Sequence, residues 1–289
     1  RDRPAGDAIQ TDVAREAAND VIDALEALGI DRTGAITVEP VDTVLSKSAH
    51  DAEKAAPGDP ADSVVWEELV SRTREESTLN GTFLAFLTIA CLLAAVGVVT
   101  DSPITVVGAM VVGPEFGPLA ALAVALMRRK LGLARRSLIA LLFGFPFAMV
   151  ATLVATLLME RVGWMEFESI ESLDQVDFIY RVGPLSLIVA LLAGAAGMLA
   201  LVSAKSAALV GGVFISVTTV PAAGFAVVAV TVGEWRVAAL AALQLGVNMV
   251  GIVIAGVLVL ALRLRSGGDP RRLLEQARKE RSPAQRRRA

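Results

Sequence analysis

Several uninterrupted apolar stretches between residues 82 and 262 constrain this chain more than any other feature of its sequence. Most are longer than the roughly 18 residues that mark a membrane-spanning helix, and such a helix crosses the ~30 Å hydrocarbon core of a bilayer. Hydrophobic residues make up 54% of the chain and charged residues 20%, and the charged ones gather at its two ends. We therefore interpret the chain as an α-helical polytopic membrane protein. This excludes an ordinary cytosolic enzyme, a disulfide-stapled secreted domain and a disordered chain.

The apolar stretches predict six spans, arranged as two three-helix halves over residues 82–159 and 184–262. The connection over 160–183 is acidic, whereas Lys and Arg crowd residues 128–130 and the tail over 263–289. Because positively charged connections remain in the cytoplasm, we expect the acidic loop outside and both termini inside. The expected location is a bacterial or archaeal cytoplasmic (inner) membrane. The six predicted spans cover about 82–100, 104–126, 137–159, 184–203, 206–232 and 237–262.

The region before the first span is acidic, with 8 Lys/Arg against 18 Asp/Glu over residues 1–80. Apolar residues at helical spacing predict an amphipathic helix over 7–29, and the β-branched run over 35–39 predicts a strand. We read residues 1–46 as a small cytoplasmic α/β domain that is truncated at its N-terminus, because the chain begins without Met. Residues 47–81 are expected to hold a linker over 47–61 and then a juxtamembrane helix over about 62–77.

Cysteine and histidine are too scarce for much of the chemistry that enzymes use. One cysteine, Cys91, and one histidine, His50, cannot form a disulfide, a zinc cage or a Cys/His dyad within one chain. No phosphate-binding loop or nucleophile elbow occurs in a usable strand–turn–helix context. We therefore expect no enzyme activity, no cofactor and no metal centre. Nucleic-acid binding is not expected either, because the basic tail lacks interleaved aromatic residues.

An internal repeat relates residues 107–124 to residues 210–227 at a shift of 103 positions. Each half then holds three spans, an odd number, so the second half enters the membrane with the opposite polarity. Inverted repeats with helices interrupted by Gly and Pro are typical of secondary transporters. The alternative is an ancient duplication that was kept for folding alone. The matched residues are Val107, Gly108, Pro118, Ala120, Ala123 and Val124 with Val210, Gly211, Pro221, Ala223, Ala226 and Val227.

Segments spread over most of the chain resemble the domain of unknown function 389 family of bacterial and archaeal membrane proteins. The resemblance is carried by Gly113-Pro-Glu-Phe-Gly-Pro118, the Pro-centred segment 211–225, Asn248, residues 35–46 and Trp66-Glu-Glu68. It implies six spans preceded by a soluble domain, and it implies no established activity. The chain departs from the pattern of the family at Glu115, where an apolar residue is usual, and at Val220-Pro221, where a Pro-Pro pair is usual.

Glu115 is the sharpest candidate for a functional residue. It lies about eleven residues into the second predicted span, between Pro114 and Pro118, and a charge at a helix centre costs roughly 2.5–3.5 kcal/mol on insertion scales. The two prolines free backbone carbonyls, so the carboxylate could bind a cation or hold a proton. The alternative is a protonated acid that is hydrogen-bonded within the bundle.

Other polar residues in the predicted spans complete the proposed substrate or ion site. Ser216, Thr218, Thr219 and Pro221 occupy the equivalent segment of the fifth span, and Thr218 matches Glu115 in the repeat. Buried hydroxyls usually bond back to their own helix. Gln244 and Asn248 lie one turn apart on the sixth span. They either join two helices by hydrogen bonds or line a transport pathway.

The sequence leaves two classes of function open. The first is transport of a small solute or ion by alternating access, with the site at the broken second and fifth spans. The alternative is a non-transporting lipid-binding, assembly or sensing module. Partners expected in either case are the bilayer, a second copy of the chain in a homo-oligomer, and anionic lipid headgroups at the basic tail. The candidate headgroup ligands are Arg263, Arg265, Arg271 and Arg272.

Overall fold

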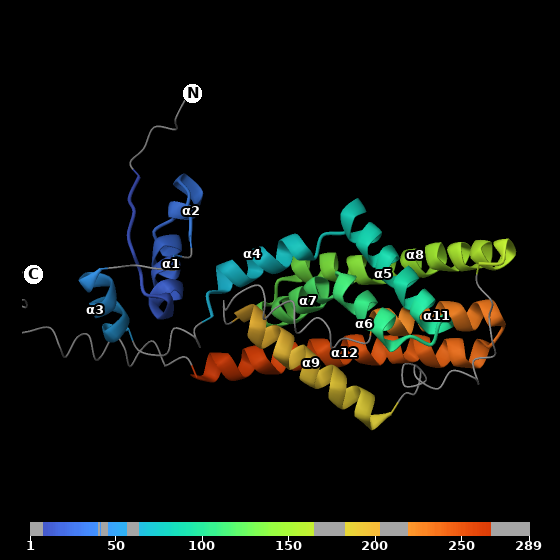
Figure 1. The fold of residues 1–289 in the computed structure, drawn as a ribbon. Coiled ribbons are helices and arrows are strands. Elements are labelled where there is room, and N and C mark those ends of the chain that lie inside the picture. The colour runs from blue at the N-terminus through green and yellow to red at the C-terminus, as the bar shows by residue number, and fades with distance from the viewer. Residues whose placement is uncertain are drawn as a thin grey trace, which may run out of the picture. The chain divides into compact units, whose positions relative to one another are not determined.

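The computed structural model describes residues 8–39, 41, 46–56, 64–164, 183–202 and 219–266. Every regular element in these ranges is a helix (Figure 1). The chain divides into two compact units, one over Arg1–Glu68 and Arg263–Ala289 and one over Leu69–Leu262. The second unit contains the apolar helices and the candidate site.

The N-terminal unit holds short helices. A 3₁₀ turn, η1 (Arg15–Ala17), leads into α1 (Ala18–Ala27), which Gly29 ends with a φ of 73° before α2 (Ile30–Thr33). The amide of Asn19 fixes the chain that leads to α4 (Trp66–Glu76): its Nδ2 donates to the Val64 carbonyl and its Oδ1 accepts from the Trp66 N–H. An ion pair of 3.1 Å joins Arg15 to Glu68.

Two expectations for this unit are wrong. Residues 35–39 form no strand, and no strand occurs elsewhere in the described residues, so an α/β domain is not supported. A β-branched run becomes a strand only where another strand pairs with it, and the described residues offer none. A further helix, α3 (Lys47–Ala55), lies where the sequence suggested only a linker. Its alanines favour a helix even without a regular apolar face.

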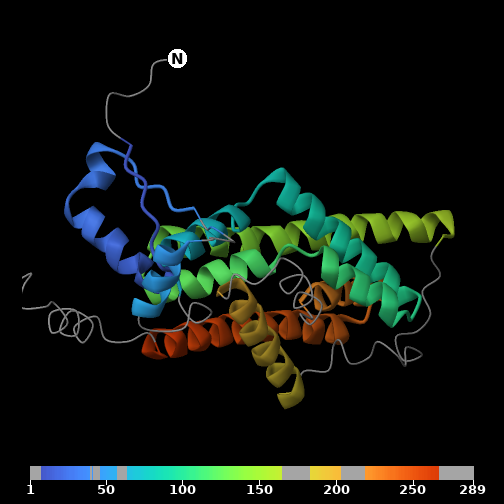
Figure 2. The ribbon, with the colours of Figure 1, turned by 60° about the vertical axis from the view of Figure 1, so that its left-hand side comes forward.

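Long apolar helices make up the second unit (Figures 1 and 2). Those that could cross a membrane are α5 (Gly81–Val99), α8 (Leu131–Val162), α9 (Pro184–Val202) and α12 (Trp235–Ser266). A fifth candidate is the bent pair of α6 (Pro103–Val112) and α7 (Phe116–Arg128). The described residues thus contain four candidate spans, or five with the bent pair, and the prediction of six is not supported. Only α11 (Thr219–Val232) represents the expected fifth span, and its 14 residues cover about 21 Å.

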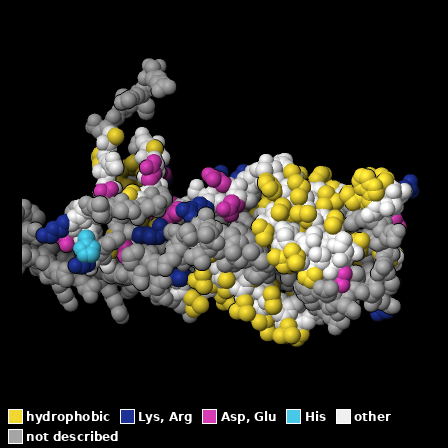
Figure 3. Space-filling view, in the orientation of Figure 1, with side chains coloured by type: hydrophobic (Ala, Val, Ile, Leu, Met, Phe, Trp, Pro, Cys, Tyr) yellow, Lys and Arg dark blue, Asp and Glu magenta, His cyan; other side chains and the backbone are white. Residues whose placement is uncertain are grey.

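The lateral surface of the second unit is apolar, as a bilayer requires. Large hydrophobic side chains point outward along the helices, and Figure 3 shows many of them gathered over this part of the molecule. On α8, Leu142 is 68% exposed and Phe143 is 67% exposed. Inside, small residues let the helices approach closely, as is usual between membrane helices. A Cβ atom on Gly194 of α9 would lie 2.7 Å from the Cα of Ile252 on α12.

Helix boundaries in the first half recur in the second. Helices α5 and α9 both have 19 residues, α8 and α12 both have 32, and α7 and α11 have 13 and 14. Their first residues are separated by 103 or 104 positions in every pair. The turns after α7 and α11 also match, because Arg129 and Gly233 both take a left-handed backbone, with φ of 53° and 87°.

Candidate functional site

A break in the second span creates the candidate site. Helix α6 ends at Val112, α7 begins at Phe116, and their axes differ by 53°. Pro114 lies in the break and has no N–H to donate to the carbonyl of Met110, four residues earlier. The sequence therefore predicted the position of this break correctly.

Pro118 has a different place from the one that the sequence suggested. It is the third residue of α7, and Pro221 is likewise the third residue of α11. In the first turn of a helix the missing N–H costs little, because those N–H groups have no partner within the helix. These prolines therefore begin the helices α7 and α11 rather than kinking a continuous one.

Glu115 lies in the break, immediately before α7, and is only 2% exposed. Its Oε1 accepts a hydrogen bond of 2.7 Å from the hydroxyl of Thr219, the first residue of α11. Its Oε2 has no hydrogen-bond partner among the described residues. The contact joins residues 104 positions apart and brings the N-terminal ends of α7 and α11 to one place.

Gly113 makes room for this carboxylate. A Cβ atom added there would collide with Oε2 of Glu115 and would lie 2.8 Å from a methyl group of Val220. The Glu115 side chain and the first turn of α11 therefore fill the space beside the end of α6. A side chain at position 113 would displace one of them.

Two further titratable groups lie near the start of α7. The thiol of Cys91 on α5 is fully buried and close enough to Glu115 for their charges to interact. The side chain of Glu76, at the end of α4, packs against Gly117, the second residue of α7. Desolvation by burial raises the pKa of Glu76 above its ordinary value. The positive charge of Arg72 opposes this rise, and the negative charge of Glu75 adds to it.

Gln244 and Asn248 belong to a second buried polar cluster, between α9 and α12. The Nε2 of Gln244 donates to Oδ1 of Asn248 at 2.9 Å, and Ser186 on α9 donates to Oε1 of Gln244 at 3.2 Å. Both amide side chains are 1% exposed. This arrangement holds two helices together, which was the commoner of the two uses considered for these residues.

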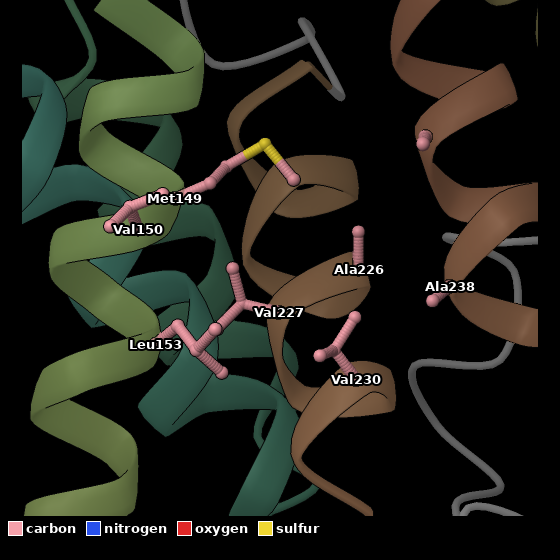
Figure 4. Close-up of a pocket in the computed structure, with 8 residues that line it drawn as sticks. Met149, Val150, Leu153, Ala226, Val227, Val230 and Ala238 are labelled. Carbon is pink, nitrogen blue, oxygen red and sulfur yellow. The ribbon is translucent and has the colours of Figure 1, made fainter. Parts of the chain in front are cut away.

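An apolar pocket of about 200 Å³ opens between α8, α11 and α12 (Figure 4). Figure 4 shows Met149 and Leu153 of α8 extending toward α11, where Val227 lies beside them. No polar side chain lines it, and neither Glu115 nor Thr219 contributes to it. The pocket suits an apolar group and is separate from the polar pair.

Several predicted site residues cannot be placed. Ser216 and Thr218 lie outside the described residues, as do Arg271 and Arg272 of the basic tail. Arg263 and Arg265 belong to the last turn of α12, where the side chain of Arg265 is not described.

The sequence reasoning missed the contributions of Gly113 and Cys91. A glycine directly before Pro114 was a signal for the first of these. Cys91 gave no signal, because its role depends on a residue of another helix. The small residues Ser186, Ala190 and Gly194 predicted a close helix contact within the chain or between subunits, and the structure shows them contacting α12.

Comparison with known proteins agrees with the resemblance noted from the sequence. The model of one family, described as domain of unknown function 389, matches residues 110–254, which include the break, α11 and the Gln244–Asn248 pair. No curated protein and no solved structure matches the chain. The family match covers half of the chain, and the chain therefore belongs to the domain of unknown function 389 family.

Proposed function

We propose that this protein is a secondary transporter that moves a small solute or ion by alternating access. The proposed substrate site lies where α7 and α11 begin, with Glu115 and Thr219 as its polar side chains. In transporters with inverted repeats, interrupted helices meet near the middle of the membrane and their ends hold the substrate and the coupling ion. Irregular backbone at that depth is tolerated only where it is buried in protein or lines a water-filled cavity.

The matched helix lengths support an inverted repeat. Equivalent helices begin 103 or 104 residues apart, and the two 32-residue helices, α8 and α12, run in opposite directions in both ribbon views (Figures 1 and 2). Opposite directions are what two three-span halves require if the second half is inverted.

Contacts between the two halves also support an inverted repeat. Gly224 of α11 packs against Ala94 of α5, and Gly197 of α9 packs against the ring of Phe116 of α7. The helix pair α5 with α11 is the repeat equivalent of the pair α9 with α7. Each half therefore places its short helix against the first helix of the other half.

The observation that carries the proposal is the buried bond between Glu115 and Thr219. It joins two half-length helices at their N-terminal ends, one from each half, and leaves one carboxylate oxygen available. A purely structural bond would be expected to satisfy both oxygens, because an unpaired buried acceptor is costly.

Cys91 offers a direct test, since it is the chain's single cysteine and a neighbour of Glu115. Its thiol is fully buried, so a membrane-impermeant methanethiosulfonate reagent can reach it only if another conformation opens the site to water. Alternating access predicts that Cys91 is modified in right-side-out vesicles and, separately, in inside-out vesicles. Mass spectrometry of the intact chain measures both rates.

The matched control is Leu142→Cys in a Cys91→Ala background. Leu142 lies on α8 and is 68% exposed on the apolar surface, so its thiol faces lipid. We expect this control to react more slowly than Cys91 from either side. Protection of Cys91 from both sides, or access from one side only, would contradict alternating access.

One observation favours a second candidate, a lipid-binding module without transport. The apolar pocket between α8, α11 and α12 could take part of an acyl chain. That function predicts a lipid that co-purifies with the wild-type chain and is lost when Ala226→Leu fills the pocket, while Cys91 stays protected on both sides.

A further inference from the structure

The two carboxylate oxygens of Glu115 face different helix ends. Oε1 points to the beginning of α11, where it accepts from Thr219. Oε2 lies beside Gly113, the residue that ends α6. The beginning of a helix carries partial positive charge and its end carries partial negative charge. Oε1 therefore faces a positive helix end, whereas Oε2 faces the negative end of α6.

No cationic side chain among the described residues compensates the negative charge of Glu115. No Lys, Arg or His of the described residues lies within 4 Å of Glu115, and Oε2 has no hydrogen-bond partner there. A buried carboxylate without a full counter-charge is unfavourable.

The oxygens available in the break are of the kind that a metal cation takes as ligands. The carbonyls of Met110 and Pro114 lose their helical donors, because positions 114 and 118 are both proline. The Thr219 hydroxyl supplies another oxygen. Carboxylate, carbonyl and hydroxyl oxygens are the ligands that hard cations prefer. Unwound carbonyls at half-helix ends hold Na⁺ in transporters built from repeats.

We propose that the break between α6 and α7 binds one monovalent metal cation, held by Oε2 of Glu115 with the freed backbone oxygens around Gly113. A single carboxylate balances one positive charge. The nearby beginnings of α7 and α11 disfavour a divalent ion. This inference rests on the proposed function, in which the cation is the coupling ion and the solute lies toward the starts of α7 and α11.

Binding of ²²Na⁺ to the purified full chain in detergent tests the site without requiring a known substrate. Wild type should show one saturable site per chain. Glu115→Gln should abolish it, because the amide keeps the shape but carries no charge. Thr219→Val should weaken it about tenfold, since the carboxylate loses its one hydrogen bond. Thr152→Val is the matched control: it removes another fully buried hydroxyl, on α8, and should leave binding unchanged.

Gly113→Ala provides a second route if Glu115→Gln does not fold. The added methyl group takes the space of the carboxylate, so sodium binding should fall while the charge stays in the chain. Cys91 gives an independent readout: replacing N-methylglucamine with sodium at constant ionic strength should change its modification rate in wild type and not in Glu115→Gln.

The outcomes separate this inference from the proposed function. Sodium binding that is absent from wild type, or equal in wild type and Glu115→Gln, would overturn the cation site. A Cys91 rate that is insensitive to sodium, and whose pH dependence differs between wild type and Glu115→Gln, would also overturn it and would assign a proton to Glu115. In either case, access to Cys91 from both sides would leave alternating access intact. If sodium binds but Cys91 is protected on both sides, the cation site would be supported and alternating access would be contradicted.

Discussion

The described helices of the first and second halves match more closely in length and spacing than in their contacts. In the first half, the ring of Phe83 on α5 packs against Gly144 on α8. The equivalent residues 103 or 104 positions later are Ser186 on α9 and Asn248 on α12, and there a chain of hydrogen bonds through Gln244 makes the contact. An apolar contact and a polar one therefore serve the same pair of helix positions. The helix framework tolerates the exchange because both contacts fill the same space.

A second difference concerns how tightly the short helices pack. Gly256 of α12 lets Ala123 of α7 approach so closely that an added Cβ would lie 2.9 Å from the Ala123 methyl group. The equivalent position on α8 is Thr152, and next to it the apolar pocket separates α8 from α11. The looser packing lies on the α11 side, which is where a helix that moves during transport would be expected.

Cysteine labelling of intact cells gives the largest expected effect and tests whether the halves are inverted. In a Cys91→Ala background, Ser172→Cys should react fully with an impermeant reagent from outside, whereas Ser282→Cys and Gly132→Cys should not. The acidic connection over 160–183 and the basic residues 128–130 predict this pattern. Labelling of Ser282→Cys from outside would mean that the second half is not inverted.

Packing of α9 on α12 should be the most sensitive contact of the second half. Gly194→Ala places a methyl group 2.7 Å from the Ile252 backbone, which cannot give way as a side chain could. We expect a loss of about 1–3 kcal/mol in the free energy of unfolding. The matched variant Gly246→Ala, on the open face of α12, should be neutral or stabilise by up to ~1 kcal/mol. Denaturation in mixed micelles measures both, and equal effects would contradict the close approach.

The hydrogen bond between Ser186 and Gln244 should contribute less to the free energy of unfolding than the close packing at Gly194 does. A double-mutant cycle of Ser186→Ala and Gln244→Ala should give a coupling of about 0.6 kcal/mol, typical of hydrogen bonds between membrane helices. A cycle of Phe83→Ala and Ala140→Gly, at the equivalent positions of the first half, contains no side-chain hydrogen bond and serves as the control. A coupling near zero at Ser186 and Gln244 would show that shape alone holds α9 against α12.

The smallest effect is expected at Glu76, whose side chain is exposed on one side. The equivalent of Glu76 in the second half lies outside the described residues, so this prediction compares the effect of Glu76 on stability at two pH values instead. A raised pKa means that the folded protein holds the proton more tightly than the unfolded chain does. Stability from this group is therefore present at low pH and falls as the pH rises from about 4.5 toward the raised pKa. Glu76→Gln should raise the unfolding midpoint slightly at pH 7.5 and lose that advantage near pH 4.5. An advantage that is constant with pH would point to packing instead.

The sequence predicted local features well and distant ones poorly. Helices α5 and α9 lie within two residues of their predicted ranges, because an apolar run and its flanking polar residues define a membrane helix locally. The break was predictable from Gly113 and Pro114. The strand over 35–39 was not a safe inference, since strand formation depends on a partner elsewhere in the chain.

The site was predicted in part. Glu115 stood out because a charge in an apolar run is rare, and the repeat directed attention to residues near 218. The structure gives the contact to Thr219, one residue further along. The role of Gly113 depends on the approach of α11, which a pattern within one helix does not contain. Gln244 and Asn248 were weaker candidates than Glu115, and the bond from Ser186 to Gln244 shows them joining α9 to α12.

Arg129 and Gly233 occupy equivalent left-handed turns in the two halves, and the difference between these two residues bears on how the chain inserts into a membrane. Glycine adopts this backbone freely, whereas an arginine there bears roughly 1–2 kcal/mol of strain. Arg129 stands beside Arg128 and Lys130 in the connection that is predicted to stay in the cytoplasm, where each positive charge helps to orient the chain during insertion. If these charges orient the chain as predicted, Arg129→Gly would give a protein that is harder to unfold but easier to insert the wrong way round.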